Sequence, residues 1–185
     1  GSRGTLGVLS EVALKVLPAP EAVTTLTVHD IAPEAAITAM TRAITSPFEV
    51  TGAAHVPGAA PRVHLRVEGF EGSVAYRAGR LRALLGELGE ITVETGAAEN
   101  AALWRGIRDV EPLQGAYALW SVSMVPSAVY AGLLPLLARE ARCDTMMDWA
   151  GGRCWVALSE EAAAAHGDGS ARDGAAALHR RLQAG

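Results

Sequence analysis

Cysteine, lysine and aromatic residues are scarce in this chain of 185 residues, and long apolar runs are missing. Its only two cysteines, Cys143 and Cys154, do not form a C-x-x-C pair, which argues against a zinc ribbon and a thioredoxin-type site. We expect both to be reduced, partly buried thiols in a cytoplasmic protein. The apolar stretch 129–137 is shorter than the ~20 residues that span a bilayer, and it contains Pro135.

An excess of positive charge is missing as well. The chain has 16 Lys and Arg residues against 20 Asp and Glu residues, and Lys15 is the only lysine. The sequence therefore offers no basic patch for nucleic acid and no polybasic membrane anchor. Half of the residues are hydrophobic, so that one globular domain, alone or with a fragment of another, can bury a core without disulfides or metal.

The first half of the chain alternates between strand and helix patterns. The clearest strand is 61–69, where Val63, Leu65 and Val67 alternate with polar residues such as His64, which predicts one buried and one wet face. The predicted order is strand 22–30, helix 32–45, strand 47–56, strand 61–69, helix 71–89 and strand 90–95. This is the ferredoxin-like order, and it predicts an α+β fold whose antiparallel sheet carries helices mainly on one face.

The second half resembles a looser version of the same theme. Its predicted elements are helix 98–110, strand 116–125, helix 126–140, a hairpin over 143–159, a flexible loop 166–174 and helix 175–184. We expect the hairpin to turn at Gly151 and Gly152, because that pair tolerates positive φ at both turn positions.

Residues 5–17 are predicted to form a buried strand, with Leu6, Val8, Val12, Leu14 and Val16 as one apolar series. Glycines at positions 1, 4 and 7 precede and enter this strand. Glycines at a strand end either form a turn or let a ligand approach the backbone closely, since no side chain intervenes.

The stretch GSRGTLGVLSEVALKVLPAPE (1–21) resembles a segment of FAD-linked oxidases of the vanillyl-alcohol-oxidase type. LWRGIRDVEP, LWSVSMVP and DWAGGRCWVAL add a looser similarity to the FAD-binding subunits of bacterial glycolate oxidases. The resemblance implies that residues 1–20 are the last strand of an FAD-binding domain and that 21–185 form the cap, or substrate, domain. It also implies that the backbone of Gly4, Thr5, Gly7 and Val8 lies against the flavin nucleotide.

The same resemblance implies a fragment, because the family's pyrophosphate-binding loops and its usual C-terminal segment have no counterpart here. Gly1 and Ser2 match the family motif and equally match a cloning scar. We therefore expect the isolated chain to be inactive and not to hold FAD tightly. If residues 5–17 find no partner strand, they should associate with a second copy as a homodimer or a swapped pair.

Arg108 is the candidate ligand for a substrate carboxylate, since related 2-hydroxy-acid dehydrogenases carry such an arginine after a similar Leu-Trp. The competing interpretation is that Arg105 and Arg108 are exposed helix residues paired with Asp109 or Glu111. Trp104 is either a substrate platform or, as we favour, a core anchor.

No metal site is predicted. Asp148 and Trp155 stand where metal-dependent relatives carry two histidines, and an indole N–H has no lone pair for a metal. The five histidines show no ligand spacing, and His64 is expected on the surface.

Two functions from different classes follow. The leading one is the cap of an FAD-dependent oxidoreductase that acts on glycolate or another 2-hydroxy acid. Either this subunit oxidises the acid itself, or its substrate site is degenerate and it passes electrons or supports a sister flavin subunit that performs the oxidation. The alternative is a non-catalytic α+β assembly module that docks other subunits, with Trp120, Trp149 and Trp155 as interface anchors. A ferredoxin-like regulatory domain is a third possibility, which no ligand loop after the helices supports.

Overall fold

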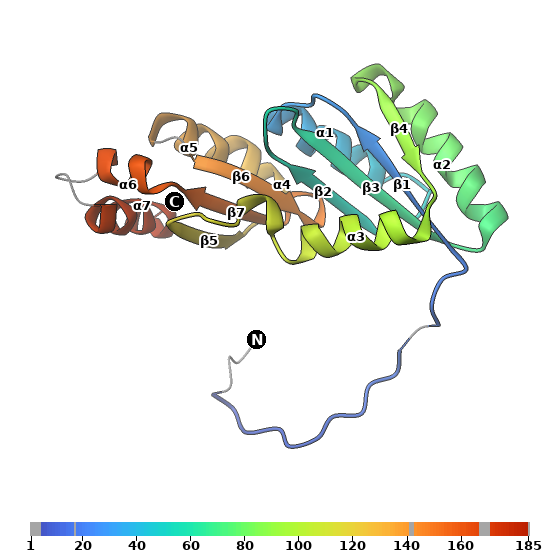
Figure 1. The fold of residues 1–185 in the computed structure, drawn as a ribbon, viewed down its shortest axis with the longest axis horizontal. Helices are drawn as coiled ribbons and strands as arrows, with labels where there is room; N and C mark the ends of the chain where they lie inside the picture. The colour runs from blue at the N-terminus through green and yellow to red at the C-terminus, as the bar shows by residue number, and fades with distance from the viewer. Residues whose placement is uncertain (1–4, 17, 141–142, 167–170, 185) are drawn as a thin grey trace.

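The computed structural model describes residues 5–16, 18–140, 143–166 and 171–184. Seven strands form one antiparallel sheet in the order β4-β1-β3-β2-β6-β7-β5 (Figure 1). The predicted α+β class with an antiparallel sheet is therefore confirmed. No helix within these ranges is long and apolar enough to cross a membrane.

The first half has the predicted ferredoxin-like order. Its elements are β1 (Ala22–Val28), α1 (Pro33–Ile44), β2 (Gly52–Val56), β3 (Arg62–Gly69), α2 (Glu71–Leu85), η1 (Gly86–Leu88) and β4 (Ile91–Glu94). Pro33 begins α1, where its fixed φ suits the first turn and its missing N–H costs nothing. The four strands lie in the order β4-β1-β3-β2.

The second half repeats part of that pattern after α3 (Ala97–Arg108) and η2 (Glu111–Leu113). Its elements are β5 (Ala118–Ser123), α4 (Pro126–Ala128), η3 (Val129–Leu133), α5 (Leu134–Glu140), β6 (Cys143–Asp148), η4 (Trp149–Gly151), β7 (Arg153–Leu158), α6 (Glu160–His166) and α7 (Ala171–Ala184). The strands β5, β7 and β6 neighbour one another as β1, β3 and β2 do. The two halves join where β2 meets β6, through the pair His55 and Met147.

The two faces of the sheet carry unequal cores. The larger core contains residues of α1, α2, η3, α5, α6 and α7, so that most helices share one face as predicted. The smaller core lies under α3 and η2, which cross the opposite face (Figure 1). Because α3 covers only part of that face, polar side chains lie beside apolar ones on it.

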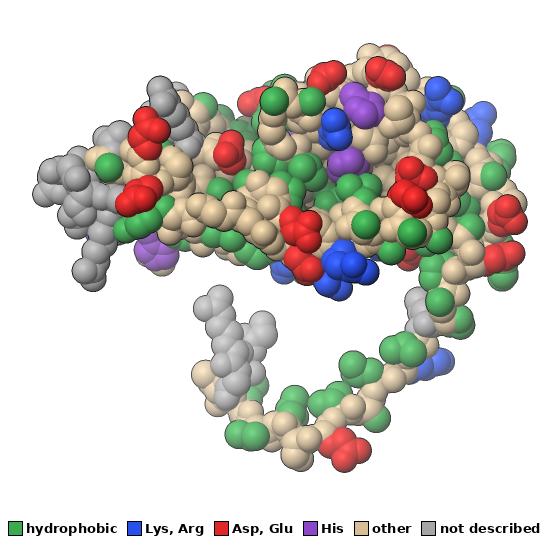
Figure 2. Space-filling view, in the orientation of Figure 1, with side chains coloured by type: hydrophobic (Ala, Val, Ile, Leu, Met, Phe, Trp, Pro, Cys, Tyr) green, Lys and Arg blue, Asp and Glu red, His purple; other side chains and the backbone are tan. Residues whose placement is uncertain are grey.

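The prediction of a buried strand over 5–17 is wrong for the described residues of that segment. Residues 5–16 are extended but pair with no strand that the structure describes, and the tail hangs away from the domain (Figures 1 and 2). Leu6 is 88% exposed and Val8 is 97% exposed. The sequence pattern suits a strand, but a strand is stable only when a neighbour binds its backbone N–H and C=O groups.

His64 is not a surface residue. Its side chain is 6% exposed, and its Nδ1 lies 2.9 Å from the Oγ1 of Thr27. Burial, followed by the charges of Arg62, His29 and His55, lowers the pKa of His64 to about 4. The strict alternation in β3 predicts a solvent-exposed face. The prediction fails because α3 returns across that face, which the sequence pattern does not show.

The hairpin forms, but its turn differs from the predicted one. Positive φ falls on Trp149, Ala150 and Gly151, whereas Gly152 has a φ of −69°. The predicted loop 166–174 is also too long, because α7 already begins at Ala171.

Candidate functional site

A groove of about 610 Å³ lies on the α3 face, where the two halves of the sheet meet. One wall comes from α3 and the adjoining strands β2 and β3, and the other comes from η4 and β7. The groove contains three of the four tryptophans of the chain, namely Trp104, Trp149 and Trp155. Four arginines and a single acid also line it: Arg66, Arg105, Arg108, Arg153 and Asp148.

Trp104 is held from below by a buried polar network. Its Nε1–H donates to the Oγ1 of Thr25 over 2.8 Å, and Thr25 in turn donates to the side-chain oxygen of Asn100. Its ring lies against Gly52, where an added Cβ would come within 2.9 Å of two ring carbons. The favoured interpretation of Trp104 as a core anchor fits these contacts, and the ring edge still lines the groove.

Arg66, the cross-strand neighbour of Gly52, stacks on the same ring. Its guanidinium carbon lies 4.8 Å from the centroid of Trp104, which is a cation–π distance. Bonds to Thr51 and a 3.1 Å contact with a carboxylate oxygen of Glu68 fix the guanidinium further. Arg66 is therefore a rigid, largely neutralised part of the wall.

A second arginine–tryptophan pair faces the first across the groove. The guanidinium carbon of Arg153 lies 3.9 Å from the ring centroid of Trp149 and 5.9 Å from that of Trp155. Arg153 forms no ion pair with any residue that the structure describes. Stacking occupies the face of a guanidinium and leaves the N–H groups at its edge free to bind a carboxylate.

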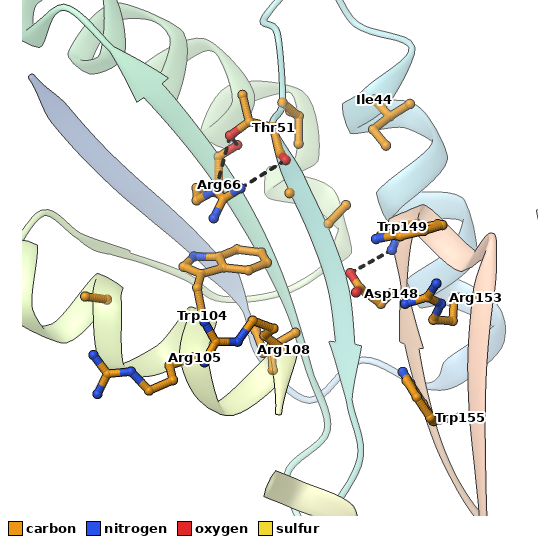
Figure 3. Close-up of a pocket in the computed structure, with 15 residues that line it drawn as sticks. Ile44, Thr51, Arg66, Trp104, Arg105, Arg108, Asp148, Trp149, Arg153 and Trp155 are labelled. Atoms are coloured by element: carbon orange, nitrogen blue, oxygen red, sulfur yellow. Dashed lines mark hydrogen bonds between the residues drawn. The ribbon is translucent and has the colours of Figure 1, made fainter. Parts of the chain in front are cut away.

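Asp148 points into the space between the two pairs (Figure 3). One of its oxygens accepts a hydrogen bond of 2.7 Å from the backbone N–H of Trp149. Burial raises the pKa of Asp148 above its usual value, although that bond and the charges of Arg153 and Arg66 act in the opposite direction. A half-buried carboxyl of this kind is suited to exchanging a proton with a ligand.

The turn that carries Trp149 is strained. Trp149 and Ala150 have φ values of 53° and 55°, in the left-handed region that favours glycine. Such conformations cost on the order of 1–3 kcal/mol each and cluster at functional sites.

Of the two residues predicted to bind substrate, both Trp104 and Arg108 line this groove. The guanidinium of Arg108 also makes two bonds to the carboxylate of Asp109, of 2.7 and 3.0 Å. That pairing raises the pKa of Arg108 and belongs to the competing interpretation of an exposed helix arginine. A substrate carboxylate would have to compete with Asp109 for this side chain.

The predicted cofactor contacts lie apart from the groove. Gly4, like Gly1 and Ser2, lies outside the described residues, whereas Thr5, Gly7 and Val8 lie in the extended tail. An added Cβ at Gly7 would meet no atom within 4 Å, so that the backbone is open to a flat ligand.

Asp148 and Trp155, at the positions where the resemblance implies two metal-binding histidines in other enzymes, also line the groove. In the ranges that the structure describes, no three His, Cys, Asp or Glu side chains gather as metal ligands. The two cysteines are free thiols. Burial, helped by the charge of Asp144, raises the pKa of Cys143 to about 11, and burial raises that of Cys154 to about 12, which leaves both thiols uncharged at neutral pH.

Sequence reasoning missed Arg153 and the role of Asp148 as an acid, and it named Trp149 only as an interface anchor. The available signal was the hairpin DWAGGRCW, which sets an acid, two tryptophans and an arginine around one turn. From the sequence, Asp148 is interpreted only as a replaced metal ligand, and Trp155 as a replaced metal ligand or an interface anchor. Their approach to Trp104 depends on the pairing of β2 with β6, which no local pattern encodes.

No family model matches the chain, and no curated protein is significantly similar to it.

Proposed function

We propose that this chain is the cap domain of an FAD-dependent oxidoreductase and that its groove binds a 2-hydroxy acid. The observation that carries the proposal is the convergence of Arg153, which has no ion-pair partner among the described residues, with the half-buried Asp148. A cationic group for a carboxylate and a proton acceptor for a hydroxyl are the two protein groups that this reaction needs.

The carboxylate binds at the edge of Arg153. The stack on Trp149 fixes the plane of the guanidinium, so that little side-chain entropy is lost when two N–H groups bind the carboxylate. Arg108 is the second cation within reach, once its bonds to Asp109 are exchanged for bonds to substrate.

Asp148 takes the proton of the substrate hydroxyl. Its position between the two arginine–tryptophan pairs places it beside a carboxylate held by Arg153 (Figure 3). FAD, if bound, would supply the acceptor for the hydride from C2 of the hydroxy acid, and residues 5–8 of the tail would hold one side of its nucleotide.

Tryptophan fluorescence of the 185-residue chain tests the groove. Glycolate should change the emission in a saturable way, whereas ethylene glycol, which lacks the carboxylate, should not. Arg153→Gln should weaken glycolate binding at least tenfold. Arg42→Gln, which breaks an exposed ion pair with Glu87 outside the groove, should leave it unchanged. A wild-type chain that gives no saturable response to glycolate would overturn the proposal.

The flavin part has its own test. In a ¹⁵N-labelled chain, millimolar FAD should shift the amide signals of Thr5, Gly7 and Val8, and Gly7→Val should weaken that response. Shifts confined to other residues would contradict the predicted contact between tail and nucleotide.

A second candidate function is favoured by the exposed apolar side chains of the tail. Leu6, Val8, Val12, Leu14 and Val16 all lie more than half exposed, and extended segments of this kind pair with other sheets. An assembly role predicts dimers in analytical ultracentrifugation that disappear when residues 5–16 are deleted. A chain that remains monomeric at high concentration with the tail intact would count against it.

A further inference from the structure

Trp149 has a backbone conformation that is unfavourable for most residues other than glycine. Its backbone is left-handed, with a φ of 53°, and glycine would adopt this conformation without strain. Its side chain is 62% exposed and so contributes little to either core. An exposed tryptophan on a strained turn needs a reason other than packing.

The groove in front of Trp149 is larger than a two-carbon acid requires. Glycolate fills about 150 Å³ even if each of its heavy atoms is given the ~30 Å³ share of a water molecule. The groove measures about 610 Å³, within the roughly 300–1,000 Å³ of pockets that hold drug-sized ligands. Most of its volume is therefore available to a substituent on the substrate.

The walls also show what kind of substituent fits. Ile44, Val50 and Ile107 also line the groove and supply apolar surface. Arg153 stacks on Trp149 at 3.9 Å, and the large exposed fraction of Trp149 leaves ring surface for a ligand. An aromatic group stacks on such a surface while a carboxylate on the same ligand reaches the edge of Arg153.

We propose that the groove selects 2-hydroxy acids that carry an aromatic ring on C2, with the ring stacked on Trp149 and the carboxylate bound by Arg153. This inference rests on the proposed function, since it names the substrate class of the same groove. Mandelate is the simplest probe of this class, and glycolate is the same headgroup without the ring.

The first measurement compares the two acids by isothermal titration calorimetry of the 185-residue chain. Mandelate should bind at least tenfold more tightly than glycolate, because its ring leaves water on binding. Hexahydromandelate, which has a saturated ring, should bind between the two. Equal affinity for mandelate and glycolate would overturn the inference and leave the proposed function standing, whereas binding of neither acid would overturn both.

Trp149→Gly separates a ligand-binding role from a structural one. Because glycine relieves the left-handed strain, the melting temperature of the variant should equal or exceed that of the wild type. Its affinities for both acids should fall, because Arg153 loses the ring that holds its guanidinium, but the mandelate affinity should fall at least tenfold more than the glycolate affinity, so that the variant no longer distinguishes the two acids. A variant that melts at a lower temperature, or that keeps its preference for mandelate, would overturn the role of Trp149.

Tyr130→Ala is the matched control. Tyr130 is likewise exposed, at 52%, and lies in η3, outside the groove. Its removal should leave both affinities unchanged. A comparable loss of mandelate binding in this variant would show that exposed aromatic residues in general, and not the groove, attract the ring.

Discussion

The two halves of the sheet share a strand order but differ in how they are completed. β1, β3 and β2 of the first half correspond in order to β5, β7 and β6 of the second. In the first half β4 also covers the outer edge of β1, whereas β5 has no outer neighbour in the part of the chain that the structure describes. The helix after β1 is a regular α1, while the helical segment after β5 is broken into α4, the π-helical η3 and α5. The succession of strands and helices therefore sets the topology even where the helices are irregular.

The largest expected effect tests whether the halves unfold together. Leu65 on β3 and Leu158 on β7 are fully buried in the same larger core. Replacing either by alanine should destabilise the domain by about 2–5 kcal/mol, through lost burial and the cavity left behind. Urea unfolding followed by far-UV circular dichroism and by tryptophan fluorescence measures this.

Fluorescence reports mainly on the second half, because three of the four tryptophans, Trp120, Trp149 and Trp155, lie there, whereas far-UV circular dichroism reports on both halves. If one core joins the halves, Leu65→Ala lowers the fluorescence midpoint as much as the dichroism midpoint. A fluorescence midpoint that stays at the wild-type value would show that the halves are independent units.

The first half could be predicted well because its patterns are regular. Val63, Leu65 and Val67 alternate cleanly, and Pro33 marks the start of α1, so that strand order and fold class followed from local signals. The burial of His64 could not be predicted, because it depends on α3 crossing a face that local alternation marks as wet. The prediction for the tail is wrong in the opposite direction, because residues expected to be buried are exposed. They have a strand pattern but no neighbouring strand within the described chain to pair with.

Some residues of the groove could likewise be predicted from local sequence, and others could not. Trp104 and Arg108 lie on one helix and were found together. Arg153 and Asp148 reach them only because β2 pairs with β6, a contact between residues more than eighty positions apart in the sequence. Sequence patterns report contacts along one element, whereas this groove is built from both halves and the helix between them.

The second prediction concerns His64, a buried residue of the first half. Its pKa of about 4 in the folded chain lies below the ordinary 6.5, so the unfolded chain binds more protons between these values. The contribution of the neutral His64 to the free energy of unfolding is therefore complete above pH 6.5 and is lost as the pH falls toward 4. Between pH 7 and pH 5, protonation of this histidine in the unfolded chain should lower the free energy of unfolding by about 2 kcal/mol.

His64→Gln keeps a polar group near Thr27 but cannot titrate. The loss of stability between pH 7 and pH 5, measured by urea unfolding, should shrink by about that amount in the variant. An unchanged loss would mean that other groups cause the acid sensitivity of the first half.

The third prediction concerns the strand where the halves join. In Gly52→Ala, the new Cβ would lie 2.9 Å from the ring of Trp104 and 3.4 Å from the Cβ of Arg66. Because both neighbours are fixed by hydrogen bonds, we expect a loss of about 1–3 kcal/mol. The emission of Trp104 should also shift as the ring moves. Unchanged stability and emission would show that Trp104 is free to move aside.

The smallest expected effect comes from the matched substitution away from the join. Gly79 lies on the exposed side of α2, and an added Cβ there would meet no atom within 4 Å. Gly79→Ala should therefore stabilise the chain by about 0.5–1 kcal/mol, since alanine loses less backbone entropy than glycine in a helix. A gain in stability for Gly79→Ala together with a loss for Gly52→Ala would show that the chain is tightly packed around Gly52 on β2 but not on the exposed side of α2. A loss at both positions would mean that glycine is needed in the first half for its backbone freedom, and that the close approach to Trp104 is not what makes Gly52 special.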